Sequence, residues 1–409
     1  MSDWKEYRLG EIIDVRDGTH DSPKKKGIGK PLVTSKHIKG GKIDLSTAYF
    51  ISIDDFDKIN KRSKVDKWDV LFSMIGTIGE TAIIKEEPDF AIKNVGLFKA
   101  KDEYTAKWIY YFFKSPQAQS EILSSLKGST QQYISLTDLR NFPITYPPIR
   151  VGWEIAEILS SLDDKIELNN KINQELENLA QALFKQWFID FEFPNENGEP
   201  YKSSGGEMVE SELGEIPEGW SFGTLKDEFN LNMGQSPKGD TYNETGDGMI
   251  FFQGRSDFGF RYPSVRMFTK DPKKVAKKFE TLISVRAPVG DINMVEYDCC
   301  IGRGLGSISH SRKLFSYTYY KILSIQEELK SYDNEGTVFG SINKETLGNI
   351  KTIIPPLTIS CGFDDLVKGK DQLIYNLTNQ NQQLTTLRDT LLPKLISGEL
   401  EVSQIQTAS

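Results

Sequence analysis

One stretch in the middle of the chain has the residue spacing of a single long helix. Between Glu154 and Ile189, apolar residues recur in steps of three and four, with one break around Asn169. This spacing is typical of a helix that buries a narrow apolar stripe against a partner helix. The rest of the chain therefore has to be arranged around a long helix and its partner.

The partner helix is expected in the same chain, because the sequence contains an internal repeat. Residues 128–188 align without a gap with residues 336–396. The identical pairs are Gly128/Gly336, Ile134/Ile342, Leu139/Leu347, Asn141/Asn349, Pro147/Pro355, Pro148/Pro356, Asp163/Asp371, Ile166/Ile374, Asn173/Asn381, Gln174/Gln382, Leu176/Leu384, Leu179/Leu387 and Leu183/Leu391. A second long helix is thus predicted from about Phe363 to Leu392, ended by Pro393 and Gly398. If a pseudo-twofold axis relates the two copies, the long helices run antiparallel.

Each long helix follows a block of short β-type segments, which we call head one (residues 1–150) and head two (residues 219–358). The strands expected in head one are Lys30–His37, Ile43–Ile53, Val70–Ile75, Thr81–Ile84 and Ala91–Lys99. An aromatic-rich helix over Tyr104–Leu126 follows them, and a helix over Leu314–Tyr332 takes its place in head two. The predicted fold class is α+β, with two heads of mixed β-sheet and helices joined by two long antiparallel coiled-coil helices.

The expected domain boundaries follow from these elements, in a chain of 409 residues that is long enough for two separate cores. They are head one at 1–150, a first spacer helix at 151–192, an acidic connector at 193–218, head two at 219–358, a second spacer helix at 359–400 and a tail at 401–409. Within the tail, Gln404–Ser409 is expected to be disordered.

The formal net charge of −8 argues against a uniformly basic nucleic-acid coat, but the charge is unevenly distributed. The connector Phe193–Glu218 is rich in glutamate, whereas the heads contain basic runs at Lys24–Lys26, Lys58–Lys67 and Arg261–Lys278. Runs of lysine are usually solvated surface, although patches in both heads also suit contact with phosphate. The cysteines show no CxxC spacing and no apolar run reaches about 18 residues, so we expect a reduced cytosolic protein without structural zinc or a membrane segment.

The sequence offers few residues for catalysis. The three histidines are scattered, no GxxxxGK phosphate loop is present, and the glycines of Gly302–Gly306 are expected to form a tight turn between strands. Tyr146–Ile149 and Ile354–Leu357 contain Pro-Pro pairs that superficially resemble the catalytic pocket of amino-methyltransferases. Neither pair follows the Asn or Asp that would accept from the target amine, so both are interpreted as structural turns.

Recognition of a ligand by the heads is the remaining interpretation. Direct readout of DNA uses Arg or Lys for guanine, Asn or Gln for adenine, and Ser or Thr for either base. Such side chains occur at matching loop positions in both heads. The candidate DNA-binding residues are Thr34, Ser35, Lys36, His37, Ser73 and Thr77 in head one and Gln253, Arg255, Ser284, Arg286 and Arg303 in head two. Any single one of them is as compatible with an ordinary hydrated loop residue, so the prediction rests on the sets.

The chain resembles the specificity (S) subunits of type I restriction–modification systems. The resemblance covers nearly the whole chain and includes the end of the first long helix (Leu183–Phe191), the re-entry into head two (Gly214–Trp220) and the terminus Leu391–Leu400. It implies that the heads are target-recognition domains, each reading one half of an asymmetric bipartite site in double-stranded DNA. It also implies methyltransferase subunits as partners, two of them in the expected complex, and restriction/translocase subunits as further partners. S-adenosylmethionine, ATP and Mg²⁺ would then bind to the partner subunits and no cofactor to this chain, which would be non-catalytic.

The chief alternative is a coiled-coil adaptor whose two heads bind proteins, which the acidic connector also suits.

Overall fold

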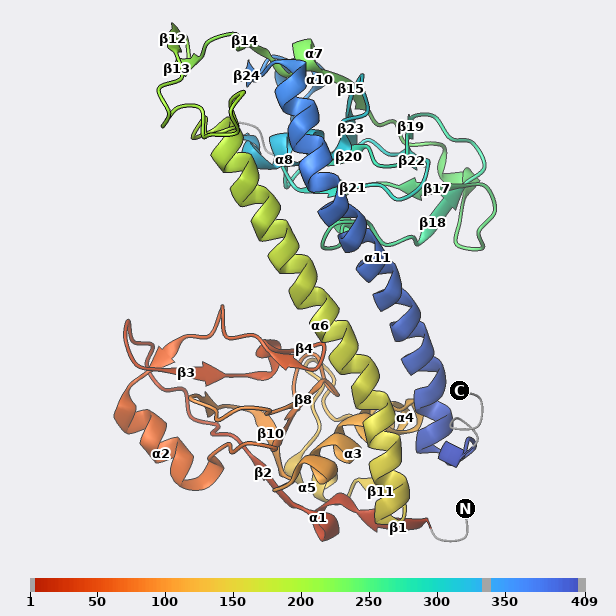
Figure 1. The fold of residues 1–409 in the computed structure, drawn as a ribbon. Helices are drawn as coiled ribbons and strands as arrows, with labels where there is room; N and C mark the ends of the chain where they lie inside the picture. Colours follow the sequence, from red (N-terminus) through yellow and green to blue (C-terminus); the bar gives the residue numbers. More distant parts are fainter. Residues whose placement is uncertain (1–3, 333–339, 404–409) are drawn as a thin grey trace. The chain divides into compact units, whose positions relative to one another are not determined.

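The computed structural model describes residues 4–332 and 340–403, and the chain divides into two compact units (Figure 1). Unit 1 consists of Met1–Asn169 and Asn379–Ser409, and unit 2 consists of Asn170–Thr378. Each unit therefore contains one head and a part of both long helices. The predicted disorder of Gln404–Ser409 concerns residues outside the described part of the chain.

Unit 1 is built on a four-stranded antiparallel sheet with the order β2-β10-β7-β8, next to a three-stranded sheet with the order β6-β3-β9. Its strands are β1 (Lys5–Arg8), β2 (Asp14–Asp17), β3 (Lys30–Val33), β4 (Ile38–Lys39), β5 (Lys42–Ile43), β6 (Phe50–Ile51), β7 (Val70–Ser73), β8 (Thr81–Ile83), β9 (Ala91–Ile92), β10 (Val95–Lys99) and β11 (Pro143–Tyr146). Strand β11 pairs with β1, and β9 runs parallel to β3.

Short helices connect the strands of head one. They are α1 (Leu9–Ile12), the 3₁₀ turn η1 (Ser35–His37), α2 (Ile53–Ser63), α3 (Glu103–Lys114), α4 (Pro116–Ser124) and α5 (Leu136–Arg140). Helix α3 begins at a cap in which the Asp102 side chain accepts from the Thr105 amide. Its Phe113 ring packs against Phe72 of β7 and Phe98 of β10, with ring centroids 5.2 and 5.3 Å away. The aromatic residues that mark α3 in the sequence thus form the core of unit 1.

Unit 2 contains a four-stranded antiparallel sheet with the order β15-β23-β20-β21 and a five-stranded sheet with the order β16-β18-β17-β22-β19. Its strands are β12 (Met208–Ser211), β13 (Gly214–Pro217), β14 (Ser221–Thr224), β15 (Phe229–Met233), β16 (Tyr242–Asn243), β17 (Met249–Phe252), β18 (Met267–Thr269), β19 (Val275–Ala276), β20 (Thr281–Ser284), β21 (Ile292–Met294), β22 (Cys299–Ile301), β23 (Leu305–His310) and β24 (Lys351–Ile354). Its shorter helices are α7 (Leu225–Glu228), η2 (Gly239–Thr241), η3 (Arg255–Asp257), α8 (Phe315–Ser324), α9 (Gln326–Ser331) and α10 (Lys344–Gly348).

The two heads share a strand arrangement. The order β15-β23-β20-β21 in head two corresponds to β2-β10-β7-β8 in head one, and the pair β14–β24 corresponds to β1–β11. In both heads one pair of strands in the second sheet is parallel, β17 with β22 and β3 with β9. Equivalent loops of the two heads can therefore be compared position by position.

The two long helices are α6 (Ile149–Phe188) and α11 (Leu357–Ile396). In unit 1, Ile155 and Leu159 of α6 belong to the same buried core as Leu392 and Leu395 of α11. In unit 2, Phe184 and Phe188 of α6 share a core with Phe363 and Val367 of α11. In each unit, the segment of α6 therefore packs with the segment of α11 from the opposite end of that helix.

The predicted stop of the second long helix at Pro393 is wrong, whereas Gly398, the other predicted stop, follows the helix end with a positive φ of 72°. Helix α11 continues through Pro393 to Ile396. Proline removes one backbone donor, but this loss falls in the last turn, where Leu392, Leu395 and Ile396 are buried and hold the chain in place.

Several predicted elements of the heads are shorter than expected. The strand predicted over Lys30–His37 ends at Val33, and Ile43–Ile53 contains only two short strands before α2 begins at Ile53. The strand predicted over Ala91–Lys99 is interrupted at Asn94, which has a positive φ of 53°. The helix predicted over Tyr104–Leu126 is divided at Ser115, because Pro116 cannot donate to α3 and instead starts α4. The helix predicted over Leu314–Tyr332 is likewise divided, at Ile325.

Candidate nucleic-acid interface

Three loops of head one meet at the ends of β2, β3 and β9. The Lys93 amide donates to Val33 O at 2.9 Å, and the Asn94 amide donates to Thr19 O at 3.2 Å. The Ser35 hydroxyl donates to Asn94 O at 3.2 Å. At Gly18, a Cβ atom would lie 2.5 Å from Ile92 O, so only glycine permits this approach of two backbones. These contacts place the candidate residues 34–36 beside the turn formed by Lys93 and Asn94.

The corresponding loops of head two meet in the same way. The Gly304 amide donates to Gln253 O at 3.2 Å, and the Arg303 amide donates to Ser236 Oγ at 3.2 Å. A Cβ atom at Gly234 would lie 2.1 Å from Gly302 O. The glycines of Gly302–Gly306 thus form the predicted turn between β22 and β23, and they bring Arg303 next to Gln253.

We add to each cluster a fourth loop, which connects an inner strand to the edge strand that follows it. In head one, the Ser73 amide donates to Glu80 O at 2.8 Å, which closes the loop that carries Thr77. In head two, the Ser284 amide donates to Asp291 O at 2.8 Å, which closes the loop that carries Arg286. The Val285 amide donates to Gly304 O at 2.9 Å, so this second loop is attached to the Arg303 turn. We call these two groups of four loops the loop cluster of head one and the loop cluster of head two.

The structure separates the candidate residues into exposed and buried ones. Lys36, Thr77, Gln253, Arg255, Arg286 and Arg303 are exposed, and Thr34 is half-buried. Ser35, His37, Ser73 and Ser284 are buried. For these four the prediction of direct contact with DNA is corrected, because their side chains lie inside the heads.

The buried candidates support the loops that carry the exposed ones. His37 Nδ1 accepts from the Thr34 amide at 2.8 Å, which caps η1, and burial and then the charge of Lys36 lower the pKa of His37. The Ser284 hydroxyl donates to Pro288 O at 2.9 Å and accepts from the Asp291 amide at 2.8 Å. These hydrogen bonds fix the shape of the loops without reaching solvent.

The cations of the loop cluster of head two differ in how firmly they are held. Arg255 forms an ion pair with Asp291, the residue that closes the neighbouring loop. Arg286 and Arg303 extend from turns at the surface. Arg255 is therefore oriented in advance by a carboxylate, whereas Arg286 and Arg303 are accessible for direct contact.

The residues of the basic runs lie in different environments in the structure. Lys24, Lys26, Lys58 and Arg62 line a cleft of about 690 Å³ between the loop after β2 and helix α2. Asp21, Asp54 and Asp55 also line it, so the cleft is mixed in charge. By contrast, Arg261, the first residue of the third basic run, is buried and does not belong to a basic surface patch.

Sequence reasoning missed two residues of the loop cluster of head one, Lys93 and Asn94. The alignment of the heads contains the signal for them, because residues 91–94 occupy the place of residues 300–303. Asn94 therefore stands where Arg303 stands in head two. Its side chain accepts from or donates to His20 Nδ1 at 2.8 Å, depending on the tautomer. Ser236 was missed as well, and no periodicity marks it.

Among the described residues, no group of three or more His, Cys, Asp or Glu side chains is arranged to hold a metal ion. Within the same ranges, no helix is both long enough and apolar enough to cross a membrane.

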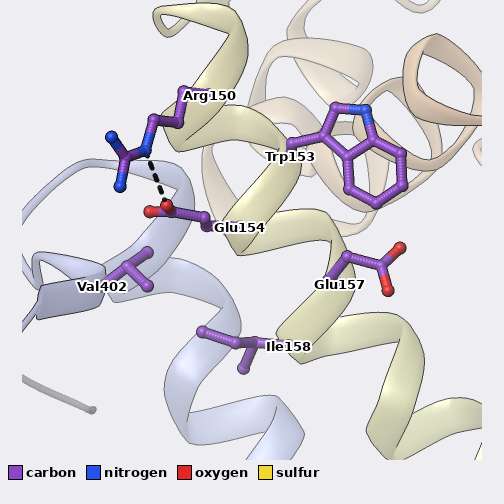
Figure 2. A pocket seen from close by; sticks show the side chains of 6 residues that line it. All are labelled: Arg150, Trp153, Glu154, Glu157, Ile158 and Val402. Carbon is purple, nitrogen blue, oxygen red and sulfur yellow. Dashed lines mark hydrogen bonds and ion pairs between the residues drawn. The ribbon is translucent and has the colours of Figure 1, made fainter.

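A separate cavity of about 400 Å³ lies in unit 1 at the start of α6 (Figure 2). Trp153, Glu157 and Ile158 line it from α6, and Val402 lines it from the end of the chain. Trp153 is 44% exposed although its ring stacks on Tyr104, with centroids 6.5 Å apart.

A family model described as "Type I restriction modification DNA specificity domain" matches residues 1–178 and again residues 217–384. The putative type I restriction enzyme MjaX specificity subunit of Methanocaldococcus jannaschii is 30% identical over 98% of this chain and 94% of its own length. The type I restriction enzyme HindI specificity subunit of Haemophilus influenzae is 24% identical over 98% of this chain and 100% of its own length.

A solved structure supports the fold. The S subunit of a type I restriction–modification system from M. genitalium aligns with a TM-score of 0.58 at 18% sequence identity, and the alignment covers 96% of each chain. At this identity the likeness concerns the fold alone.

Proposed function

The chain belongs to the type I restriction–modification specificity subunits, and from this premise we propose that each head reads one half of a bipartite, asymmetric DNA site. As a member of this family it is the DNA-recognition subunit of a type I restriction–modification system and has a non-catalytic role. The adaptor alternative is therefore set aside. The proposal concerns how recognition is divided between the two heads.

The observation that carries the proposal is the pair of loop clusters. The two clusters share a framework of backbone hydrogen bonds and glycines, but the side chains that they expose differ. Lys36 and Asn94 of head one stand where Arg255 and Arg303 stand in head two. A common scaffold with different polar side chains is suited to reading two different sequences.

Within this proposal, base edges are contacted by the exposed candidates. Arg286, Arg303 and Arg255 are of the residue type that makes bidentate contacts with guanine, and Gln253 is of the type that does so with adenine. Lys36, Thr34 and Thr77 of head one contact bases or the adjacent phosphates. Ser35, His37, Ser73 and Ser284 maintain the loop shapes on which these contacts depend.

The long helices are proposed to form an antiparallel coiled coil that sets the distance between the heads. We assign the chain to head one (1–150), spacer helix (151–192), connector (193–218), head two (219–358), spacer helix (359–400) and tail (401–409), as the sequence predicts. Asn169 supports the pairing, because its side-chain amide donates to Gln380 Oε1 and Asn381 Oδ1, both at 2.8 Å. A polar pair between two packed helices fixes their register.

The proposed partners are two methyltransferase subunits, with restriction/translocase subunits as additional members of a cytoplasmic complex. We propose the cavity beside Trp153 as part of the methyltransferase-binding surface, because it joins an exposed aromatic ring to the charged Arg150 and Glu157. S-adenosylmethionine, ATP and Mg²⁺ belong to the partner subunits in this scheme.

Exchange of one head tests the proposal. Residues 1–150 would be replaced by the equivalent block of a relative, and the methylated sites would be mapped in cells with the matching methyltransferase partner. We expect one half-site to change and the other to stay the same. A change in both half-sites, or in neither, would contradict the division of recognition between the heads.

A further inference from the structure

A buried arginine joins head two to both long helices within unit 2. Arg261 Nη1 donates to Asp371 Oδ1 of α11 at 3.2 Å, and Nη2 donates to Glu177 of α6 and, at 2.6 Å, to the Tyr320 hydroxyl of α8. The guanidinium also lies 4.0 Å from the centre of the Tyr319 ring, and the side chain has no exposed surface. We call Arg261, Glu177, Tyr320 and Asp371 the unit 2 junction cluster.

Unit 1 contains a related cluster at the same place in its fold. The Tyr111 hydroxyl of α3 donates to Asp163 Oδ2 of α6 at 2.8 Å. Arg388 Nη1 of α11 donates to the other oxygen of the same carboxylate at 2.6 Å. We call Tyr111, Asp163 and Arg388 the unit 1 junction cluster. It, too, connects a head helix to both long helices.

The aspartates of the two clusters are identical residues in the internal repeat, but the arginines are not. Asp163 aligns with Asp371. Arg388 aligns with Ala180, which is buried in unit 2 and is uncharged. In unit 2 the guanidinium comes instead from Arg261 of head two. The combination of tyrosine, aspartate and arginine thus recurs although the arginine originates from different elements.

Simple stabilisation does not explain this recurrence. A buried ion pair often contributes little net stability, because the desolvation of its charges offsets their attraction. A buried ion pair does constrain the relative orientation of the elements that it joins, since each hydrogen bond requires a particular geometry of donor and acceptor. Burial, and then the charge of Asp163, raises the pKa of Tyr111, so its hydroxyl remains a donor at neutral pH. A similar increase in the pKa of Tyr320 results mainly from burial.

We propose that the two junction clusters orient the heads on the long helices, and that Asp163 and Asp371 are positioning residues for the recognition of the bipartite site. The inference rests on the proposed function. A head that turns on its helices no longer presents its loop cluster in register with the groove of DNA. Loss of a junction cluster would then weaken the reading of one half-site and widen the range of accepted gap lengths.

The test uses the full-length chain in complex with its methyltransferase partner. Asp371→Asn and Asp163→Asn each remove one charge with little change in shape. Asp164→Asn is the matched control on α6, because Asp164 also pairs with head one through Lys85, at 2.8 Å, but in a solvent-exposed ion pair. Methylation is measured on a DNA library in which each half-site and the gap between them are varied.

For Asp371→Asn we expect about a tenfold loss of discrimination at the half-site of head two, comparable to the effect of one mismatched base pair. The half-site of head one should be read as in the wild type, and Asp163→Asn should give the reverse pattern. Methylation should extend to sites with gaps one base pair longer or shorter. The Asp164→Asn control should match the wild type.

Two results would overturn the inference. One is an equal loss of methylation at all sites, in proportion to the loss of folded protein. The other is no change in the discrimination between half-sites. Tyr320→Phe and Tyr111→Phe, which remove only a hydroxyl group, serve as second variants if the aspartate variants do not fold. These are expected to show the same half-site selectivity to a smaller extent. If the wild-type complex shows no preference for a bipartite site, the proposed function fails, and this inference with it.

Discussion

Arg303 is the most direct test of base reading at the scale of single residues. It occupies the turn between β22 and β23, which backbone contacts attach to the loops that carry Gln253 and Arg286. Arg303→Ala is expected to cost about 1–3 kcal/mol of binding at one base pair, which is the discrimination of a good bidentate contact. The measurement is binding of the complex to DNA duplexes that carry each base at each position. Arg312→Ala, an exposed arginine beyond the other end of β23, is the matched control. A uniform loss on all sequences would make Arg303 a phosphate contact.

His37 makes the stability of the folded chain depend on pH. Its Nδ1 accepts from the Thr34 amide, so this hydrogen bond requires the neutral ring. The pKa of His37 is lowered, mainly by burial and then by Lys36, and Asp44 opposes this effect. The folded state therefore binds fewer protons than the unfolded state below the ordinary histidine pKa, and stability decreases as the pH falls below about 6.5.

His37→Gln should reduce the loss of stability at low pH, because an amide oxygen can accept a hydrogen bond from the Thr34 amide at any pH. Thermal unfolding of the full chain between about pH 5 and pH 8 provides the measurement. Burial also lowers the pKa of His310, so part of the dependence should persist in the variant and disappear only with a second substitution there. Identical pH profiles for His37→Gln and the wild type would contradict the role assigned to His37.

At the scale of elements, the apolar spacing predicted the positions of the long helices well and the ends of helices less well. The spacing of apolar residues located both long helices, and the aromatic run located α3. The division between α3 and α4 was missed although Pro116 signals it, because the apolar pattern continues across it. Pro393 had the opposite effect, since it was taken to end α11 whereas tertiary packing keeps the last turn helical.

The alignment of the two heads located the loops that carry the candidate residues, but it did not show which of their side chains are exposed. Matching loops identified Arg303 and Lys36 correctly as surface residues. Ser73 and Ser284 lie at the ends of strands that are buried on both faces, and the sequence does not reveal on which side of the loop a serine points. Arg261 is a similar case, because its burial depends on Glu177 and Asp371, which are distant in the sequence.

The asparagine pair between the long helices is expected to lower the stability of the chain and to fix the register of the two helices. Asn169 is fully buried and bonded to Asn381, whereas apolar residues at such positions would pack more favourably. Replacement of both by leucine is expected to raise the melting temperature and to broaden the range of gap lengths that are methylated. Calorimetry and site mapping measure the two effects. A higher melting temperature with an unchanged single gap length would show that other contacts set the register.

At the scale of the whole molecule, we propose that the long helices act as a spacer of fixed length between two independently reading heads. Insertion of four helical residues into α6 after Asn169, together with four into α11 after Thr378, lengthens each helix by about 6 Å. That length corresponds to slightly less than two base pairs at about 3.4 Å each. The added rotation of roughly 40° is close to the twist of a single base pair, so a head can still follow the groove.

The spacer role of the long helices is tested by a map of methylated sites in cells that express the wild-type chain or this insertion variant with the methyltransferase partner. We predict the same two half-sites in both cases, separated by one or two additional unread base pairs in the variant. Altered half-sites with an unchanged gap, or a wild-type site that is not bipartite, would contradict this proposal.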